Sequence, residues 1–367
     1  MKRSEKRELE IEHEVLKILS MNARASFNFI GNKIGTSAQQ AYRIVKRLEK
    51  KYGIKYLAEI NVEKLGFIKF LVLVKFLDSS PTEKEVKEIF DREPRIQVAM
   101  MLSGKNYDLL LYILVKNNED IEGLRIDLTN NTALNNYPLR LYFTPFYEGY
   151  NFVPLRDEFV DMLREQVISQ KTAQKYPVIK EKQQIMLKRE FAILKEWNID
   201  GSLDLREIDR KYGFDKGRAQ YAYYRLLQSG LIKRLTITMT RIPVKYISML
   251  SIEVFGFNKF YSTRKRMFLD IVSEQNTPPN RYILIGDVGS PFSVLLFLPV
   301  FEGGDTETVA TILSRIKGIN IATHVITKLY GRLCFRRFDN TYSMQAETLA
   351  KNYNYVLPKK INYLGKE

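Results

Sequence analysis

Apolar residues near the start of the chain recur with the spacing of short amphipathic helices. Residues 9–20 form one such segment, and residues 27–34 form a second that ends at Gly35, where a left-handed residue is needed. Ser37, or Thr36 before it, caps a third segment that runs to about Lys51. Its inner face carries Ala41, Ile44 or Val45, and Leu48. With the alternating residues 54–60 as a strand, the pattern predicts a winged helix-turn-helix.

The periodicity then changes to that of a sheet with two helices. Strands are predicted at 67–77, 96–102, 107–115 and 139–146, and helices at 82–91 and 120–128. The order β-α-β-β-α-β is the ferredoxin-like arrangement, in which an antiparallel sheet carries its helices on one face.

This whole unit occurs twice. Residues 26–55 align without a gap with residues 204–233, which lie 178 positions later, and Arg47-Leu48 falls on Arg225-Leu226. A third helix to about Ser229 and a strand within 231–241 follow. The second sheet is predicted from segments 246–254, 263–275, 282–285, 292–298, 306–316 and 321–329. The expected fold class is α+β, with two winged helix-turn-helix domains alternating with two ferredoxin-like domains.

The repeat divides the chain into six regions. An amphipathic helix at 155–169 and a polar connection separate the two units, and we expect this helix to pack against the first half. The predicted regions are winged helix-turn-helix 1 (1–62), sheet domain 1 (63–150), helix and linker (151–183), winged helix-turn-helix 2 (184–241), sheet domain 2 (242–338) and a C-terminal tail (339–367).

Net charge changes the picture more than composition does. The formal charge is +16 and the pI is near 9.5, which favours a polyanionic partner, although a generally lysine-rich proteome would give the same excess. Cys334 is the single cysteine, so we expect no disulfide and no cysteine metal site. The N-terminus is charged and the apolar strip 67–76 is too short to span a bilayer. We expect a cytoplasmic, nucleoid-associated protein of a prokaryote, without a membrane partner.

The outward face of the third helix is the candidate site. Glutamine pairs with adenine and arginine with guanine in the major groove, while lysine suits phosphates. Any solvated amphipathic helix also has such a surface, which is the bland alternative. The candidate DNA-binding residues of the first copy are Ser37, Gln39, Gln40, Tyr42, Arg43, Lys46, Arg47, Lys50 and Lys55.

The second copy repeats the inner face of this helix but not its surface. Asp215 is the expected cap, and Gly217 falls within the predicted helix. The strand after the helix offers two more cations for phosphates. The candidate DNA-binding residues of the second copy are Lys216, Arg218, Gln220, Tyr221, Tyr224, Arg225, Lys233 and Arg234.

A winged helix, the hinge segment INVEKLGF and a sheet domain containing SGKNYDLLLYILV resemble the Lrp/AsnC family of transcription regulators. The resemblance covers residues 8–147. In that family the turn before the third strand carries glycine, a short gap and then Tyr-Asp, which Gly104, Tyr107 and Asp108 match. In the second copy Gly289 and Phe292 stand at the corresponding places, and Ser293 replaces the aspartate.

The resemblance implies a sequence-specific regulator that binds double-stranded DNA. Family members pair through their sheets as homodimers, so the two halves are expected to form an intramolecular pseudo-dimer, with further homo-dimerisation left open. Because the outward residues of the two copies differ, the two half-sites should differ as well. Many relatives bind an amino acid near the Tyr-Asp turn, which makes Gly104, Tyr107 and Asp108 candidate effector residues; a purely structural turn is the alternative.

Chemistry for catalysis is sparse. The chain has two histidines and no phosphate-binding loop, and we expect no enzyme activity, no cofactor and no metal. Some proteins of the same fold are haem-pathway decarboxylases that act on an acidic tetrapyrrole, and this is the first alternative function. A basic stripe along the third helices favours DNA, whereas a basic cavity between the sheets favours the enzyme. A non-specific architectural chromatin protein is the second alternative.

Overall fold

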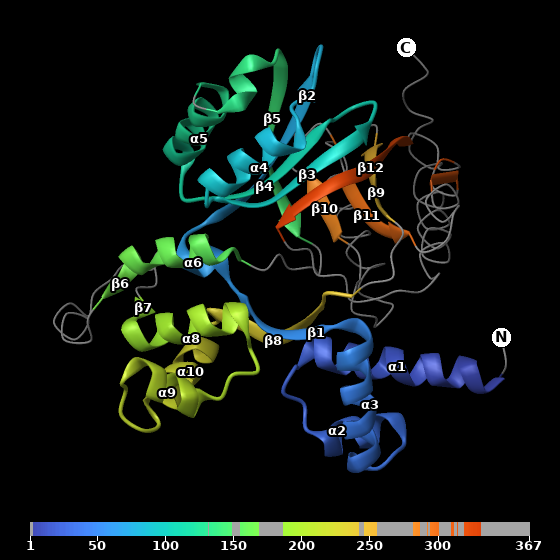
Figure 1. Cartoon of the computed structure of the whole chain (residues 1–367), viewed down its shortest axis with the longest axis vertical. Helices are drawn as coiled ribbons and strands as arrows, with labels where there is room; N and C mark the ends of the chain where they lie inside the picture. The colour runs from blue at the N-terminus through green and yellow to red at the C-terminus, as the bar shows by residue number, and fades with distance from the viewer. Residues whose placement is uncertain are drawn as a thin grey trace, which may run out of the picture.

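The computed structural model describes residues 3–130, 132–148, 155–168, 186–241, 246–254, 282–286, 292, 294–300, 310–311, 314 and 319–331. Two helix-turn-helix units lie side by side at one end of the molecule, and a β-barrel lies at the other (Figure 1). The first unit consists of α1 (Arg3–Met21), α2 (Phe27–Ile34) and α3 (Ala38–Tyr52), and the second of α8 (Lys188–Ile199), α9 (Leu205–Tyr212) and α10 (Arg218–Gln228).

The predicted wing strands are present, but they pair with each other. The two strands, β1 (Ile54–Ile60) and β8 (Ile232–Met239), form an antiparallel two-stranded ribbon between the two units. The loop after each first helix docks on the strand of the other unit: Ala23 N–H donates to the Leu235 carbonyl, and Gly201 N–H to the Tyr56 carbonyl. A Cβ on Gly201 would lie 2.9 Å from the Leu57 nitrogen, so this close approach requires glycine. The ribbon therefore ties the units together.

The first sheet domain has the predicted β-α-β-β-α-β order. Its strands pair antiparallel in the order β3-β4-β2-β5, and its two helices cover the outer face (Figure 1). A reciprocal capping box between Thr82 and Glu85 begins the first of these helices. The elements are β2 (Ile68–Phe76), α4 (Glu83–Arg92), β3 (Ile96–Gly104), β4 (Leu109–Val115), α5 (Asn118–Asn130) and β5 (Leu139–Glu148), with short 3-10 helices at Val62–Leu65 and Ala133–Asn136.

Strands of the second sheet domain close the first sheet into a barrel. The seams join the last strand of each domain to the second strand of the other: β12 pairs with β3, and β10 pairs with β5. These strands are β9 (Tyr246–Val254), β10 (Tyr282–Gly286), β11 (Val294–Val300) and β12 (Ile319–Gly331). The predicted helix at 263–275 lies outside the described residues, as do most of that at 306–316, Gly289, Ser293, Cys334 and the tail 339–367.

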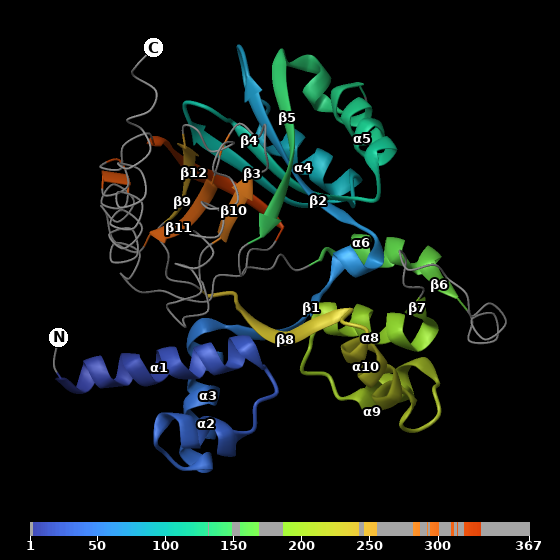
Figure 2. The same ribbon diagram turned by 180° about the vertical axis from the view of Figure 1, so that it is seen from behind.

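The segment between the two halves is shorter in helix than predicted. The expected helix over 155–169 is limited to α6 (Asp157–Met162), followed by a 3-10 turn at Leu163–Gln166 and by β6 (Val167–Ile168), which pairs with β7 (Met186–Leu187). Arg156 directly precedes the helix, and its buried guanidinium donates to the carbonyls of Glu93 and Ile96 in the first sheet domain. On its other side, Asn198 of α8 donates to the Leu155 carbonyl. The segment thus packs between both halves (Figure 2).

Candidate nucleic-acid interface

Local capping fixes the first helix-turn-helix. The Ser26 hydroxyl accepts from Phe29 N–H at the start of α2, and Gly35 ends that helix at φ 71°. Of the two caps considered for α3, Ser37 is the one used, and its hydroxyl accepts from Gln40 N–H at 3.2 Å. The inner face of α3 is buried as predicted, with Ala41, Ile44, Val45 and Leu48 in the core.

The outward face of α3 is exposed as predicted. Arg43, Lys50 and, on β1, Lys55 have exposed side chains without an ion-pair partner among the residues that the structure describes. Lys46 pairs with Glu49 at 2.7 Å, but this surface pair is weak enough to exchange for a phosphate. Tyr42 packs edge-to-face on Phe27 of α2, with ring centroids 5.2 Å apart. The exposed side chains are Gln39, Gln40, Tyr42, Arg43, Lys46, Arg47, Lys50 and Lys55.

Two of the predicted DNA-binding residues take part in a repeated ion pair. Arg47 lies 3.4 Å from the buried carboxylate of Glu12 on α1, and Arg225 lies 3.2 Å from the buried carboxylate of Glu190 on α8. Both members of the first pair recur 178 positions later as the second pair. Because each arginine neutralises a buried charge, we interpret both as residues that hold the third helix against the first. The repeat offset was the sequence signal that could have found them.

Two further cations are engaged at the ribbon. Arg234 Nε lies 2.6 Å from the Glu59 carboxylate, across the β1–β8 pairing, and Lys233 lies 3.8 Å from Glu63. The sequence placed both on a free wing, facing phosphates. Their strand instead pairs with the other unit, and its partner supplies the carboxylate for Arg234.

The second helix-turn-helix has a different start to its third helix. Gly217 is not inside α10 but is its N-terminal cap, at φ 83° and without a capping side chain. Asp215 does not cap the helix; the buried carboxylate of Asp209 does so from α9, accepting from Gly217 N–H and Ala219 N–H at 2.8 Å each. The exposed predicted residues of this copy are Lys216, Arg218, Gln220, Tyr221 and Tyr224, together with Lys233. Aromatic groups thus replace the basic face of α3.

The three candidate effector residues lie together at the β3–β12 seam, with His324 of the second domain. The His324 ring stacks on Tyr107 with centroids 5.6 Å apart, and a Cβ on Gly104 would lie 2.1 Å from its Nδ1. Asp108 accepts from Phe76 N–H and pairs with Lys75, so both of its oxygens are engaged. His324 is fully buried, and neither ring nitrogen has a hydrogen-bond partner among the described residues. Sequence reasoning gave His324 a structural role but not this contact.

His324 makes the stability of the seam dependent on pH. Burial lowers the pKa of its imidazole, an effect that the Asp108 carboxylate opposes and that nearby Lys75 reinforces. Because the folded pKa lies below the unfolded value near 6.5, stability is complete above that value and falls as the pH drops below it. We expect His324→Leu to reduce the loss of unfolding free energy between pH 7.5 and 5.5. Urea unfolding at the two pH values checks this; an unchanged difference contradicts it.

In the described part of the chain, no helix is long and apolar enough to cross a membrane. Nor do three or more histidine, cysteine or acidic side chains gather there in a way that could hold a metal.

Fold and exposed third helix together define a two-module helix-turn-helix protein. No family model matches the chain. An uncharacterized HTH-type transcriptional regulator of Pyrococcus furiosus is 30% identical over 107 residues, which cover 29% of this chain and 70% of the relative. The HTH-type transcriptional regulator Ptr1 of Methanocaldococcus jannaschii is 31% identical over 115 residues, covering 31% of this chain and 74% of the relative. This chain belongs to the family of HTH-type transcriptional regulators that these relatives represent.

A solved structure shares the arrangement of the whole chain. The siroheme decarboxylase NirDL matches 93% of this chain and 99% of its own, with a TM-score of 0.50 and 12% identity. At that identity the likeness concerns the fold alone. The fold of the whole chain is therefore shared with an enzyme.

Proposed function

We propose that this protein is a sequence-specific transcription regulator that binds duplex DNA as an intramolecular pseudo-dimer. The observation that carries the proposal is the exposed face of α3, where Arg43 and Lys50 have no ion-pair partner in the described chain while Arg47 is held by Glu12. Arg43 is suited to a base edge and Lys50 to a phosphate. Association with the nucleoid follows from the same contacts.

The second module supports an asymmetric site. Its third helix presents Tyr221 and Tyr224 where α3 presents Arg43 and Lys46, and the β1–β8 ribbon holds the two modules together. Apolar contacts to thymine methyl groups and fewer charge contacts suit this surface. The two half-sites should therefore differ, whereas a homodimer of identical units would bind a palindrome.

Arg43→Gln and Lys50→Gln are expected to affect DNA binding differently. Loss of a base contact by Arg43→Gln should weaken specific binding by about 10- to 100-fold and relax the preference at one base pair. Lys50→Gln should weaken all sequences alike and lower the salt slope by about one. Gel shifts at several salt concentrations, followed by footprinting, measure both effects.

Lys84 of α4 provides the matched control. It is an exposed residue of α4, a helix that lies on the barrel at the opposite end of the molecule from the helix-turn-helix units (Figure 1), so Lys84→Gln removes the same charge outside the proposed interface. If Arg43→Gln and Lys50→Gln both bind as the control does, α3 is not the contact surface. Equal affinity for random DNA in competition would favour the architectural role.

An amino-acid effector at Gly104, Tyr107 and Asp108 is a further proposal. Since Lys75 and the Phe76 N–H occupy the Asp108 carboxylate, a bound amino acid has to displace Lys75 or take its contacts from other groups at the seam. Isothermal titration with a panel of amino acids tests this. Absence of heat throughout would leave the turn with its packing role against His324.

Tetrapyrrole decarboxylation remains the second candidate because the whole-chain fold matches a siroheme decarboxylase. A basic protein also attracts an acidic tetrapyrrole. Titration with an iron tetrapyrrole, followed by its absorption band, separates the two functions. A saturable shift of the band favours the enzyme; DNA binding that depends on Arg43 and no such shift favour the regulator.

A further inference from the structure

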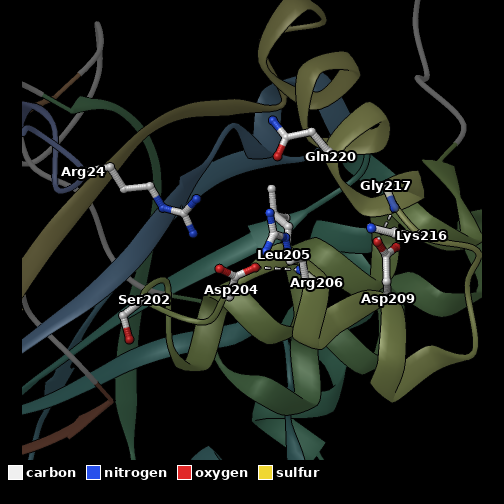
Figure 3. Close-up of a pocket in the computed structure, with 9 residues that line it drawn as sticks. All are labelled: Arg24, Ser202, Asp204, Leu205, Arg206, Asp209, Lys216, Gly217 and Gln220. Atoms are coloured by element: carbon white, nitrogen blue, oxygen red, sulfur yellow. Dashed lines mark hydrogen bonds between the residues drawn. The ribbon is translucent and has the colours of Figure 1, made fainter.

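A pocket of about 600 Å³ opens on the second helix-turn-helix (Figure 3). Its walls come from the starts of α9 and α10, and Arg24 reaches it from the loop after α1 in the other module. Arg24 is held in place by hydrogen bonds to the carbonyls of Gly201 and Leu203 and lies 4.4 Å above the ring of Trp197. Both modules therefore contribute to this pocket.

Two residues in the wall of this pocket are smaller than their counterparts in the first copy. The repeat places Leu205 and Gln220 of the pocket wall at the positions of Phe27 and Tyr42 in the first copy. Those two rings pack against each other with centroids 5.2 Å apart. The second copy lacks this aromatic pair and has smaller side chains at both positions of the pocket wall.

Three cations line the pocket without an ion-pair partner among the described residues: Arg24, Arg206 and Lys216. Two carboxylates also line it, but both accept hydrogen bonds from backbone N–H groups. Asp204 accepts from Arg206 N–H at 2.7 Å, and Asp209 caps α10. Three cations against two carboxylates leave the lining with one net positive charge.

We propose that this pocket binds a phosphate group. Guanidinium groups match phosphate oxygens in pairs, and an ammonium adds a point charge, which is the combination that the pocket offers. None of the three cations has a basic counterpart in the other copy, where their positions are Ser202, Asn28 and Ala38. Because Arg24 belongs to the first module and Lys216 to the second, a bound phosphate links the two helix-turn-helix units.

The phosphate has two sources: a free phosphorylated small molecule or the DNA backbone. A titration with a free phosphate compound distinguishes them. Trp197 reports binding by its fluorescence, because it is the only tryptophan of the chain and lies directly under Arg24. Titration of the full chain with pyrophosphate at constant ionic strength should change its fluorescence saturably, whereas chloride should not. Arg206→Gln with Lys216→Gln should weaken this binding at least tenfold, and Lys84→Gln should leave it unchanged.

Leu205→Phe with Gln220→Tyr is the sharpest variant, since it rebuilds in the second copy the aromatic pair of the first. It should fill the pocket and abolish pyrophosphate binding while circular dichroism and the unfolding midpoint stay close to those of the wild type. Pyrophosphate that binds this variant as tightly as the wild type occupies another place, and the proposal is then wrong. Arg206→Gln with Lys216→Gln, at two exposed positions, gives the same test without altering packing.

Duplex DNA forms the second arm. If pyrophosphate produces no signal but the Arg206→Gln, Lys216→Gln variant lowers the salt slope of duplex binding by about two, the DNA backbone supplies the phosphate. If neither pyrophosphate binding nor the salt slope changes with these residues, the pocket binds no phosphate. The proposed regulator function fails separately, because its test depends on Arg43 and Lys50 of the other module.

Discussion

Gly104→Ala is expected to lower the free energy of unfolding by about 3 kcal/mol, the upper part of the usual range for overpacking a core. The added Cβ would lie 2.1 Å from His324 Nδ1 and 2.8 Å from its Cγ. His324 cannot move away easily, because it is fully buried and stacked on Tyr107. Gly104 is not among the described glycines with positive φ, so the requirement is for space and not for a backbone conformation.

A double variant isolates this contact. His324→Ala removes the ring, so Gly104→Ala should cost at least about 1 kcal/mol less in that background than in the wild type. Urea unfolding followed by circular dichroism measures the four proteins of the cycle. Equal costs in both backgrounds would mean that Gly104 is needed for the turn itself and not for the approach of the second sheet.

Arg225→Leu is expected to cost about 3 kcal/mol, because it leaves the buried Glu190 carboxylate without its cation. Arg47→Leu, its counterpart in the repeat, should cost about 1 kcal/mol. The difference arises because Lys51 remains 2.8 Å from the Glu12 carboxylate after Arg47 is lost. Denaturant unfolding of the two variants side by side gives the comparison.

The pH adds a second signature to Arg225→Leu. Burial already raises the pKa of Glu190, and loss of the nearby positive charge raises it further. A folded pKa above the unfolded value means that the variant loses stability as the pH rises from 5 to 8. Should Arg47→Leu lower the salt slope of DNA binding by about one, and Arg225→Leu unfold like the wild type, both arginines would be DNA contacts after all.

Local structure was largely predictable from the sequence. Gly35 and Gly213 end the second helix of each unit in the left-handed conformation, as the turn pattern indicated, because such ends depend on neighbouring residues alone. The helical spacing of the apolar residues in α3 was enough to predict which of its faces is exposed. Gly217 was misplaced because a glycine near a helix start is compatible with both an interior and a cap position, and its capping partner Asp209 lies on the preceding helix.

Long-range contacts were not predictable from local patterns. Alternation predicts that residues 54–60 form a strand but carries no information on its partner, which is β8 of the other module. Helical period likewise predicts that Arg47 is exposed and not that it reaches a buried glutamate on α1. Gly104 and His324 meet only because the two sheets close into one barrel, and no spacing between them indicates this.

Because the barrel closes within one chain, the pairing of its two sheets does not depend on the protein concentration. Two separate subunits must associate before both recognition helices can act, whereas here the linker keeps the second sheet beside the first at an effective concentration of about millimolar. Dilution therefore cannot dissociate the two sheet domains at the strand pairs β3–β12 and β5–β10. Each half is also always matched with the same, unlike partner, so under the proposed function a substitution in one half would change one half-site only.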